Sequence, residues 1–392
     1  MKQPLGFEDG TDRVARLRLS LYGLKQASRL WNNYMTKKLT TLGWTQIKTD
    51  GAVFVRDTDS GSAMMAVHVD NFVTFADSKE ELSRVRKELH LTFEMKEEDP
   101  DWLMGFRLID DRERRTVTIL HTQYIDTILE RFNLAECNPT STPMEAGLQL
   151  SKSDSPQNEE EKKEMHDVPF RELVGSLLWT SLVCHPEITQ AVCQVARFNA
   201  NPGRRHWEAA KRILKYLKGR KDSGLVLGGE PEHALEITAY SDASWAEDRD
   251  DRRSTSGYVA KLGKATVSWS SKKQTTVATS SCEAEYMAAA YCARHVIWMR
   301  RLLTELGGDL DGQPTTFLLD NKSAIDLAKD SRINQRTKHI DIAHHFVREN
   351  VENGSLAIQH CPGKEMLADG FTKALPSAAF EKMTIGLGLA LQ

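Results

Sequence analysis

The hydrophobic pattern of the first third of the chain has short apolar runs that are followed by a stretch with helical character. Residues 52–58 (AVFVRDT) and 62–76 (SAMMAVHVDNFVTFA) are rich in apolar and β-branched residues and predict the strands of a hairpin. A helix is predicted over 78–89, because Ser78 is a suitable N-cap and Glu81 stands three residues further on. This part of the chain therefore predicts a mixed helix and sheet domain.

The middle of the chain has a different pattern. Residues 138–168 are rich in Pro, Ser and charge, which is typical of a mobile linker. Residues 169–221 have helical spacing that is interrupted at Pro186 and Pro202. We expect a group of short helices there.

The last of these predicted helices is strongly basic. Residues 204–221 contain eight Lys or Arg and one Glu, and their apolar positions fall at helical spacing. A cationic face of this kind can neutralise the phosphates of a nucleic acid, although a solvated helix face gives the same pattern. The candidate nucleic-acid-binding residues are Arg204, Arg205, Lys211, Arg212, Lys215 and Lys218.

Four acidic residues of the C-terminal part stand where predicted elements begin or end. Asp242 and Asp320 close short apolar runs, Glu285 opens a long alanine-rich helical stretch, and Asp369 begins a segment after the strand-like SLAIQHC. Carboxylates are the ligands that hard divalent cations prefer. Two such cations about 4 Å apart are an effective device for cleaving a phosphodiester. The order strand, helix, strand, helix therefore predicts a catalytic site that binds two Mg²⁺ or Mn²⁺ ions.

The sequence segments around these acids resemble those of a known family. The segments SDASWAEDRDDRRSTSGYV, WSSKKQTTVATSSCEAEY, LLDNKSAIDLAKD, RTKHIDIAHHFVREN and LADGFTKAL resemble the type-one RNase H of copia-type LTR retrotransposon polyproteins. The resemblance implies a mixed five-stranded sheet with flanking helices. It also implies hydrolysis of the RNA strand of an RNA–DNA hybrid, with Asp242, Glu285, Asp320 and Asp369 as metal ligands.

Glu283 competes with Glu285 for the second ligand position, since both belong to the same EAE triplet. On a helix the two side chains point about 200° apart, so only one can face the metals. Glu285 is preferred because the sequence after it, EYMAA, is similar to that of the family's helix.

An earlier part of the chain resembles the copia-type reverse transcriptase. The matching segments are LYGLKQASRLWNNYMTKKL, AVHVDNFVTFADSKEELSRVRKEL, DWLMGFRLIDD, QYIDTILERFNL and FRELVGSLLWTSLVCHPEITQAV. Where the family's hairpin has Tyr-Val-Asp-Asp, this chain has His68, Val69, Asp70 and Asn71. The resemblance also places the partner aspartate on a strand upstream of the segment that matches Met1. We therefore expect a degenerate, truncated polymerase site and no DNA polymerase activity.

The predicted fold class is α/β (α+β) with several domains. Residues 1–137 are expected to form a truncated reverse transcriptase with palm-like and thumb-like parts, and 138–168 a linker. Residues 169–232 are expected to form a helical tether, and 233–380 an RNase H-like domain. The expected partners are an RNA–DNA hybrid and other parts of a Pol polyprotein.

Composition changes this picture little. The chain has 392 residues, a formal net charge of −3 and 40% hydrophobic residues, as in an ordinary globular protein. No signal peptide or membrane span is expected, which favours a cytoplasmic particle or the nucleus. The six cysteines lack zinc-site spacing and are expected to be thiols. Two alternatives to a nuclease stay open: a non-catalytic transposon relic, or an RNase H-like module that only binds nucleic acid.

Overall fold

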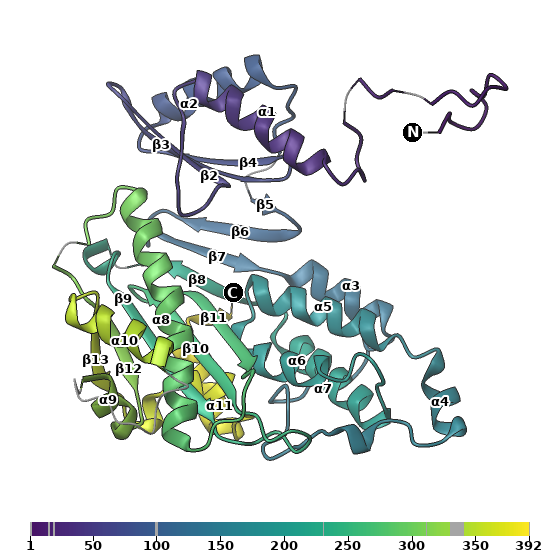
Figure 1. The fold of residues 1–392 in the computed structure, drawn as a ribbon, viewed down its shortest axis with the longest axis vertical. Coiled ribbons are helices and arrows are strands. Elements are labelled where there is room, and N and C mark those ends of the chain that lie inside the picture. The colour runs from purple at the N-terminus through teal and green to yellow at the C-terminus, as the bar shows by residue number, and fades with distance from the viewer. Residues whose placement is uncertain are drawn as a thin grey trace. The chain divides into compact units, whose positions relative to one another are not determined.

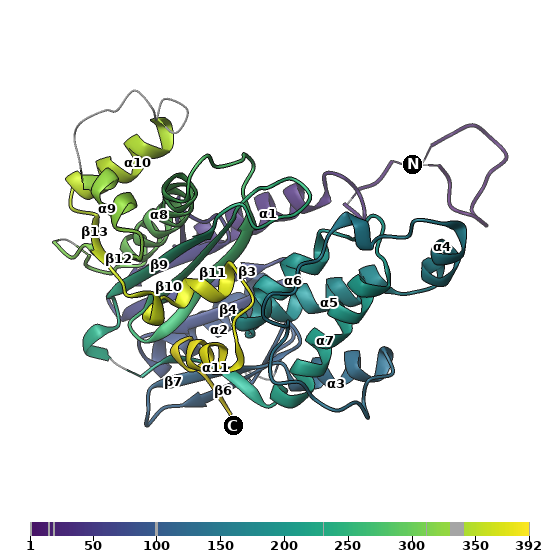
Figure 2. The same cartoon turned by 90° about the horizontal axis from the view of Figure 1, so that it is seen from below.

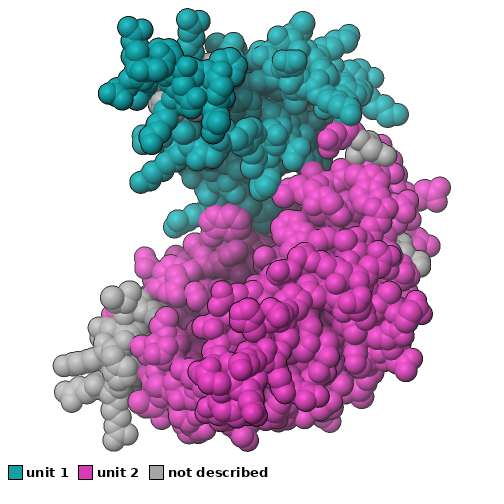
Figure 3. Space-filling model, turned by 90° about the vertical axis from the view of Figure 1, so that its right-hand side faces the viewer, with its two compact units in different colours: residues 1–97, 301–308 teal, residues 98–300, 309–392 magenta. Residues whose placement is uncertain are grey.

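The computed structural model divides the chain into two compact units, which Figure 3 colours separately. Unit 1 comprises residues 1–97 and 301–308, and unit 2 comprises 98–300 and 309–392. The structure describes residues 2–14, 16–18, 20–98, 101–229, 231–310, 312–329 and 341–391.

Unit 1 contains a four-stranded antiparallel sheet in the order β1-β2-β3-β4. Alternate side chains of the strands point to one face, where Phe54 and Met65 pack with Leu39 and Val85 of two helices into a core. The elements are α1 (Ala27–Thr41), β1 (Thr45–Gln46), β2 (Val53–Thr58), β3 (Gly61–His68), β4 (Asn71–Ala76) and α2 (Lys79–Thr92).

The predicted hairpin and the capped helix of this unit are both confirmed. Strands β3 and β4 pair in register, with His68 opposite Asn71 at the turn. The side chain of Ser78 accepts a hydrogen bond from the backbone amide of Glu81 at 3.1 Å, so it caps α2 as expected.

Unit 2 contains two five-stranded sheets, and the first has the order β14-β8-β7-β6-β5. All its neighbouring strands are antiparallel, and strands distant in sequence meet in it, since β14 pairs with β8. Its strands are β5 (Trp102–Leu103), β6 (Phe106–Asp111), β7 (Thr116–Leu120), β8 (Ser223–Gly228) and β14 (Leu389–Leu391).

Five helices follow β7 in the chain, and those from α5 to α7 form much of the core of unit 2. Leu177, Val192 and Leu214 are fully buried and contribute to one large cluster with Phe371 from the C-terminal part. The helices are α3 (Thr122–Arg131), α4 (Glu159–His166), α5 (Phe170–Val183), α6 (Thr189–Ala196) and α7 (Arg204–Arg220).

The segment 138–168 differs from the mobile linker that we predicted. Met144 and Leu150 are buried in the core of unit 2, and the segment carries a short 3-10 helix and α4. Arg212 of α7 pairs with Glu145 at 3.0 Å. Polar composition is misleading here because two apolar side chains suffice to dock the segment onto α7. The structural boundary also follows residue 97, so the boundary expected at residue 137 lies inside unit 2.

The second sheet of unit 2 is mixed and has the order β11-β10-β9-β12-β13. Strands β9, β10 and β11 are antiparallel neighbours, whereas β12 runs parallel to both β9 and β13. The strands are β9 (Ile237–Ser244), β10 (Thr255–Leu262), β11 (Ala265–Lys273), β12 (Thr315–Leu319) and β13 (Leu356–His360).

Helices cover both faces of this mixed sheet. Figures 1 and 2 show α8, α9 and α10 on one side of it and α11 on the other. The elements are α8 (Ser281–Glu305), α9 (Lys322–Lys329), α10 (Asp341–Glu352), the 3-10 helix η6 (Leu367–Phe371) and α11 (Ser377–Gly386). The predicted fold class, with its mixed five-stranded sheet and flanking helices, is confirmed.

Three further observations complete the fold. Most of the motif RTKHIDIAHHFVREN lies in α10, but its first residues, up to 340, fall outside the described residues. All six cysteines are free thiols, as predicted. No described helix has the length and apolar character that a membrane crossing would require.

Candidate metal centre

Asp242 lies on β9, the central strand of the mixed sheet. Its side chain is only 3% exposed, and its Oδ2 accepts a hydrogen bond from the Thr372 hydroxyl at 2.5 Å. β9 carries mostly small buried residues at this end, so the carboxylate lies among neighbours from other elements rather than in water.

The segment η6 brings Asp369 to this strand, and one glycine permits the approach. Gly257 of β10 pairs with Asp242 across the sheet. A Cβ atom at Gly257 would lie 2.8 Å from the Cβ of Phe371 and 2.8 Å from the Cγ2 of Thr372, closer than such atoms can approach. The absence of a side chain at this position therefore lets η6 pack directly on β10.

Asp320 completes a compact group of three carboxylates. It follows the last residue of β12, which is parallel to β9, so Asp242 and Asp320 lie near the same end of the sheet. One carboxylate oxygen from each of Asp242, Asp320 and Asp369 lies within 4.8 Å of the others. The three acids, which are 127 residues apart in sequence from first to last, are thus close enough to share a cation.

Glu285 is the fourth predicted ligand and lies in the first turns of α8. It is 8% exposed, and its Oε2 is buried without a hydrogen-bond partner among the described residues. Glu283 is placed differently, since its Oε2 accepts hydrogen bonds from the Thr279 amide at 2.7 Å and the Thr279 hydroxyl at 2.5 Å. Glu283 thus stabilises the start of α8, whereas Glu285 keeps one buried carboxyl oxygen, Oε2, without a partner in the described residues.

The acids repel one another, and this repulsion alters their pKa values. Burial, followed by the negative charge of Asp369, raises the pKa of Asp242 to about 7. Burial and the charges of Asp242 and Asp320 raise the pKa of Glu285 to about 9. Burial and Asp369 also raise the pKa of Asp320. These raised pKa values show that the charged forms of the acids are disfavoured by burial and by one another, and a bound cation would favour the charged carboxylates.

Two neighbours of the acids were absent from the sequence prediction. Thr372 donates to Asp242, and the Lys373 ammonium lies 3.0 Å from Asp369 Oδ1. Burial lowers the pKa of Lys373, but its ion pair with Asp369 outweighs that effect and the pKa is raised. The sequence could have indicated both residues, because they stand three and four residues after Asp369 and so lie within one helical turn of it.

The hairpin predicted as a degenerate polymerase site lies in unit 1. Asp70 and Asn71 are exposed at the β3–β4 turn, and Val69 has φ of 58°, a left-handed conformation that β-branched residues rarely adopt. The Trp31 indole donates to the Val69 carbonyl at 2.6 Å, which ties α1 to the turn. Among the described residues, no group of three potential metal ligands forms there.

The basic face of α7 is largely occupied by intramolecular partners. Arg205 pairs with Asp154, Lys211 with Glu208 and Arg212 with Glu145, while Lys218 donates to the Cys137 carbonyl. Of the six predicted nucleic-acid contacts, only the Arg204 and Lys215 side chains have no partner within the described ranges. Two of these pairs, those of Arg205 and Arg212, join the basic stripe to the segment 138–168, which favours a structural role for these two side chains.

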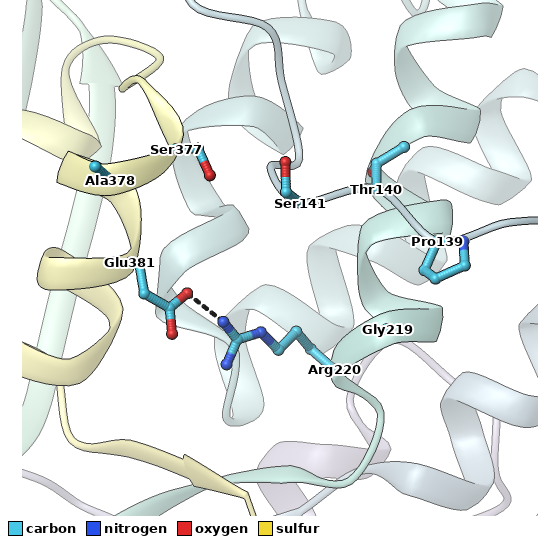
Figure 4. Close-up of a pocket in the computed structure, with 8 residues that line it drawn as sticks. All are labelled: Pro139, Thr140, Ser141, Gly219, Arg220, Ser377, Ala378 and Glu381. Carbon is cyan, nitrogen blue, oxygen red and sulfur yellow. Dashed lines mark hydrogen bonds and ion pairs between the residues drawn. The ribbon is translucent and has the colours of Figure 1, made fainter.

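A separate hollow of about 600 Å³ lies between the segment 139–141, the end of α7 and the start of α11 (Figure 4). Its two charged residues, Arg220 and Glu381, pair with each other. Because this pairing leaves no unbalanced charge, the hollow lacks the features of an ion site.

Comparisons with known proteins agree with both parts of the chain. Residues 1–146 match the family model described as reverse transcriptase (RNA-dependent DNA polymerase). The Pol polyprotein from transposon TNT 1-94 of Nicotiana tabacum is 38% identical over 97% of this chain and 29% of its own length. The Pol polyprotein from transposon RE2 of Arabidopsis thaliana is 34% identical over 99% of this chain and 26% of its own length. The chain thus spans less than a third of these polyproteins.

Solved structures give weaker similarities. An RNase H1 from Halobacterium salinarum is 16% identical, covers 35% of this chain and 94% of its own, and has a TM-score of 0.26. The LC11-RNase H1 isolated from compost is 22% identical, with coverage of 38% and 96% and a TM-score of 0.26. We base the fold class on the strand order and directions described above.

A shorter relative establishes the family. A putative transposon Ty5-1 protein of Saccharomyces cerevisiae is 32% identical over 295 residues, which are 74% of this chain and 92% of that protein. The chain therefore belongs to the family of copia-type retrotransposon Pol polyproteins and corresponds to their reverse transcriptase and RNase H part.

Proposed function

We propose that this chain hydrolyses the RNA strand of an RNA–DNA hybrid at the site formed by Asp242, Glu285, Asp320 and Asp369. The observation that carries the proposal is the convergence of these acids at one end of a mixed sheet, where three of them have oxygens within 4.8 Å. Burial and the charges of the neighbouring acids raise the pKa of Asp242 and Glu285, and strongly shifted carboxyl groups of this kind are typical of functional sites.

The residues present fit a pair of divalent cations. Carboxylate oxygens are the donors that Mg²⁺ and Mn²⁺ prefer, and the buried Oε2 of Glu285 has no hydrogen-bond partner among the residues that the structure describes. Bound there, two such ions would activate a water for attack on phosphorus and support the leaving 3′ oxygen. The four carboxylates would hold them.

The neighbouring side chains would keep these carboxylates in position. Thr372 fixes the rotamer of Asp242 through its hydroxyl, and Lys373 holds Asp369 through an ion pair. Both come from the segment that Gly257 allows to approach β10. The sheet and η6 would thus preorganise the charges before a substrate binds.

The proposed substrate follows from the family and from the site. An RNA–DNA hybrid is recognised through its shape and the 2′-hydroxyls of its RNA strand. Other parts of a Pol polyprotein are the proposed protein partners. For unit 1 we propose no polymerase activity, because the hairpin offers the single carboxylate of Asp70 beside the neutral amide of Asn71.

Hydrolysis of a labelled hybrid tests this function. In Mg²⁺ or Mn²⁺, the purified chain should cut the RNA strand and leave duplex DNA of the same sequence intact. Asp320→Asn should reduce the rate by roughly a hundredfold or more, because it removes a ligand charge with little change of volume. Circular dichroism should show the same fold. Equal rates for the two proteins would overturn the assignment, and hybrid binding without cleavage would support a binding module instead.

A further inference from the structure

His121 stands at the corner of unit 2 where β7 ends and α3 begins. Its side chain is 1% exposed, and neither ring nitrogen, Nδ1 or Nε2, has a hydrogen-bond partner among the described residues. It is the N-cap residue of α3, but its side chain makes no capping hydrogen bond. Buried polar atoms without partners cost free energy, so this ring calls for an explanation other than hydrogen bonding.

Aromatic side chains hold the ring in place. Tyr124 of α3 stacks on it, with ring centroids 4.5 Å apart and an angle of 11° between the planes. Trp179 of α5 meets it edge-on at a centroid distance of 6.4 Å. Such contacts stabilise a ring through its faces and edges and do not use its nitrogens. The corner is thus closed by packing that a neutral imidazole satisfies.

The turn after α5 adds a positive charge to this region. His185 is fully buried, and its Nδ1 lies 2.9 Å from Glu187 Oε1. Burial opposes the charged form of His185, but the effects of Glu187 and Cys184 outweigh it and raise the pKa of His185 to about 10. His185 is therefore protonated at neutral pH.

The carboxylates of the surrounding elements are engaged with other groups. Glu187 Oε1, which faces His185, also accepts a hydrogen bond from the Tyr216 hydroxyl of α7 at 3.4 Å. Charged side chains of α3, α5 and α7 form pairs of their own: Asp126 with Lys221, Arg131 with Glu172, and Arg220 with Glu381. These pairs leave His121 with the charge of His185 and without an ion-pair partner in the described part of the chain.

Protonation of His121 is therefore unfavourable while the corner is closed. Burial, followed by the charge of His185, lowers the pKa of His121 from its ordinary 6.5 to about 4. When the corner opens and the ring reaches water, its pKa returns to the ordinary value, so the open form binds the proton more tightly. The closed form keeps its full stability above about pH 6.5 and loses stability as the pH falls toward 4.

We propose that His121 makes the corner between β7 and α3 an acid-sensitive joint of unit 2. The joint is closed while the imidazole is neutral and packed against Tyr124 and Trp179. Uptake of a proton beside the charged His185 separates the corner from α5 and from the turn at 184–187. The joint is built from other residues than the acidic site, and it operates whether or not the chain cleaves a hybrid.

Hydrogen–deuterium exchange of the full chain, measured in peptides that cover 116–131, tests the joint. After correction for the intrinsic effect of pH on exchange, the opening constant of wild type should rise about tenfold through His121 between pH 7.5 and 5.5. His121→Phe keeps a flat ring against Tyr124 but has no titratable nitrogen, so its rise should be smaller by that factor. Because neither nitrogen has a partner in the described residues, this variant should open no more readily than wild type at pH 7.5. His166→Gln, at an exposed histidine that ends α4, is the matched control and should keep the wild-type rise.

The comparison separates an acid-sensitive joint from a ring that only packs. An equal rise of the opening constant in wild type and His121→Phe would overturn the proposal, whatever the stability of the variant at pH 7.5. If His121→Phe does not fold, His121→Gln gives the same comparison with a smaller neutral side chain. An NMR titration of the labelled histidine rings of wild type provides an independent measurement. The His121 ring should still be neutral at pH 5.5, whereas titration near its ordinary value of about 6.5 would contradict the proposal.

Discussion

The acidic site of the mixed sheet and the β3–β4 hairpin of unit 1 both present an aspartate near a strand end, but in different surroundings. Asp242 is 3% exposed and shares its site with Asp320 and Asp369, whose oxygens lie within 4.8 Å. Asp70 is exposed at a two-residue turn beside Asn71.

The comparison shows what distinguishes a cluster of buried carboxylates from a solvated carboxylate. At the sheet, four elements each supply an acid, and burial together with mutual repulsion raises the pKa of Asp242 and Glu285. At the hairpin one element supplies one acid. Cation binding requires several carboxylates to be held close together, which costs folding free energy. In the described part of the chain, such a group occurs only at the mixed sheet.

The largest effect is expected from Glu285→Gln. It removes the carboxylate of a buried group whose Oε2 has no hydrogen-bond partner in the described part of the chain, so the rate of hybrid cleavage should fall by about a hundredfold or more. Single-turnover kinetics in Mg²⁺ measure this.

Glu283→Gln is the matched control, two residues away. Its carboxylate accepts from Thr279, so the change should lower the free energy of unfolding by about 1 kcal/mol and leave the cleavage rate nearly unchanged. The reverse ranking of the two rates would mean that the second ligand has been assigned to the wrong glutamate.

A smaller loss is expected from Gly257→Ala, which touches none of the acids. The added methyl group would displace η6 from β10, so Asp369 and Thr372 should move relative to Asp242. We expect a rate loss of ten- to a hundredfold and a loss of about 1–3 kcal/mol in stability. Gly175→Ala in α5 is the control, because a Cβ there meets nothing within 4 Å. Wild-type activity of Gly257→Ala would contradict the positioning role.

The smallest effect is expected at the hairpin. Asn71→Asp restores a second carboxylate, but the described residues provide no third ligand near it. Neither the unmodified chain nor the variant should extend a primer on a poly-rA template. Extension by either protein above a no-enzyme blank would refute the account of unit 1.

The sequence was sufficient to predict the positions of the four acids because each stands at the end or start of a periodic run. Helix geometry indicated only that one of Glu283 and Glu285 can face the metals, and the choice of Glu285 came from the resemblance of EYMAA to the family's helix. The supporting contacts of Gly257 and Thr372 could not be predicted in this way, because they depend on the packing of η6 against a strand more than a hundred residues away.

The basic helix and the segment 138–168 show where a prediction from composition fails. Composition alone indicated a free cationic face and a mobile linker. In the structure Met144 and Leu150 anchor the segment, and its acids Glu145 and Asp154 pair with Arg212 and Arg205. The residues that pair with a run of charged side chains cannot be predicted from the sequence of that run.

Equilibrium binding of Mn²⁺, followed by electron paramagnetic resonance, tests the central claim most directly. Wild type and Asp70→Asn should bind the ion with the same stoichiometry and affinity, whereas Asp242→Asn should lose most of the binding, because the ligands converge at the mixed sheet. Binding that is weakened by Asp70→Asn and retained by Asp242→Asn would contradict the account.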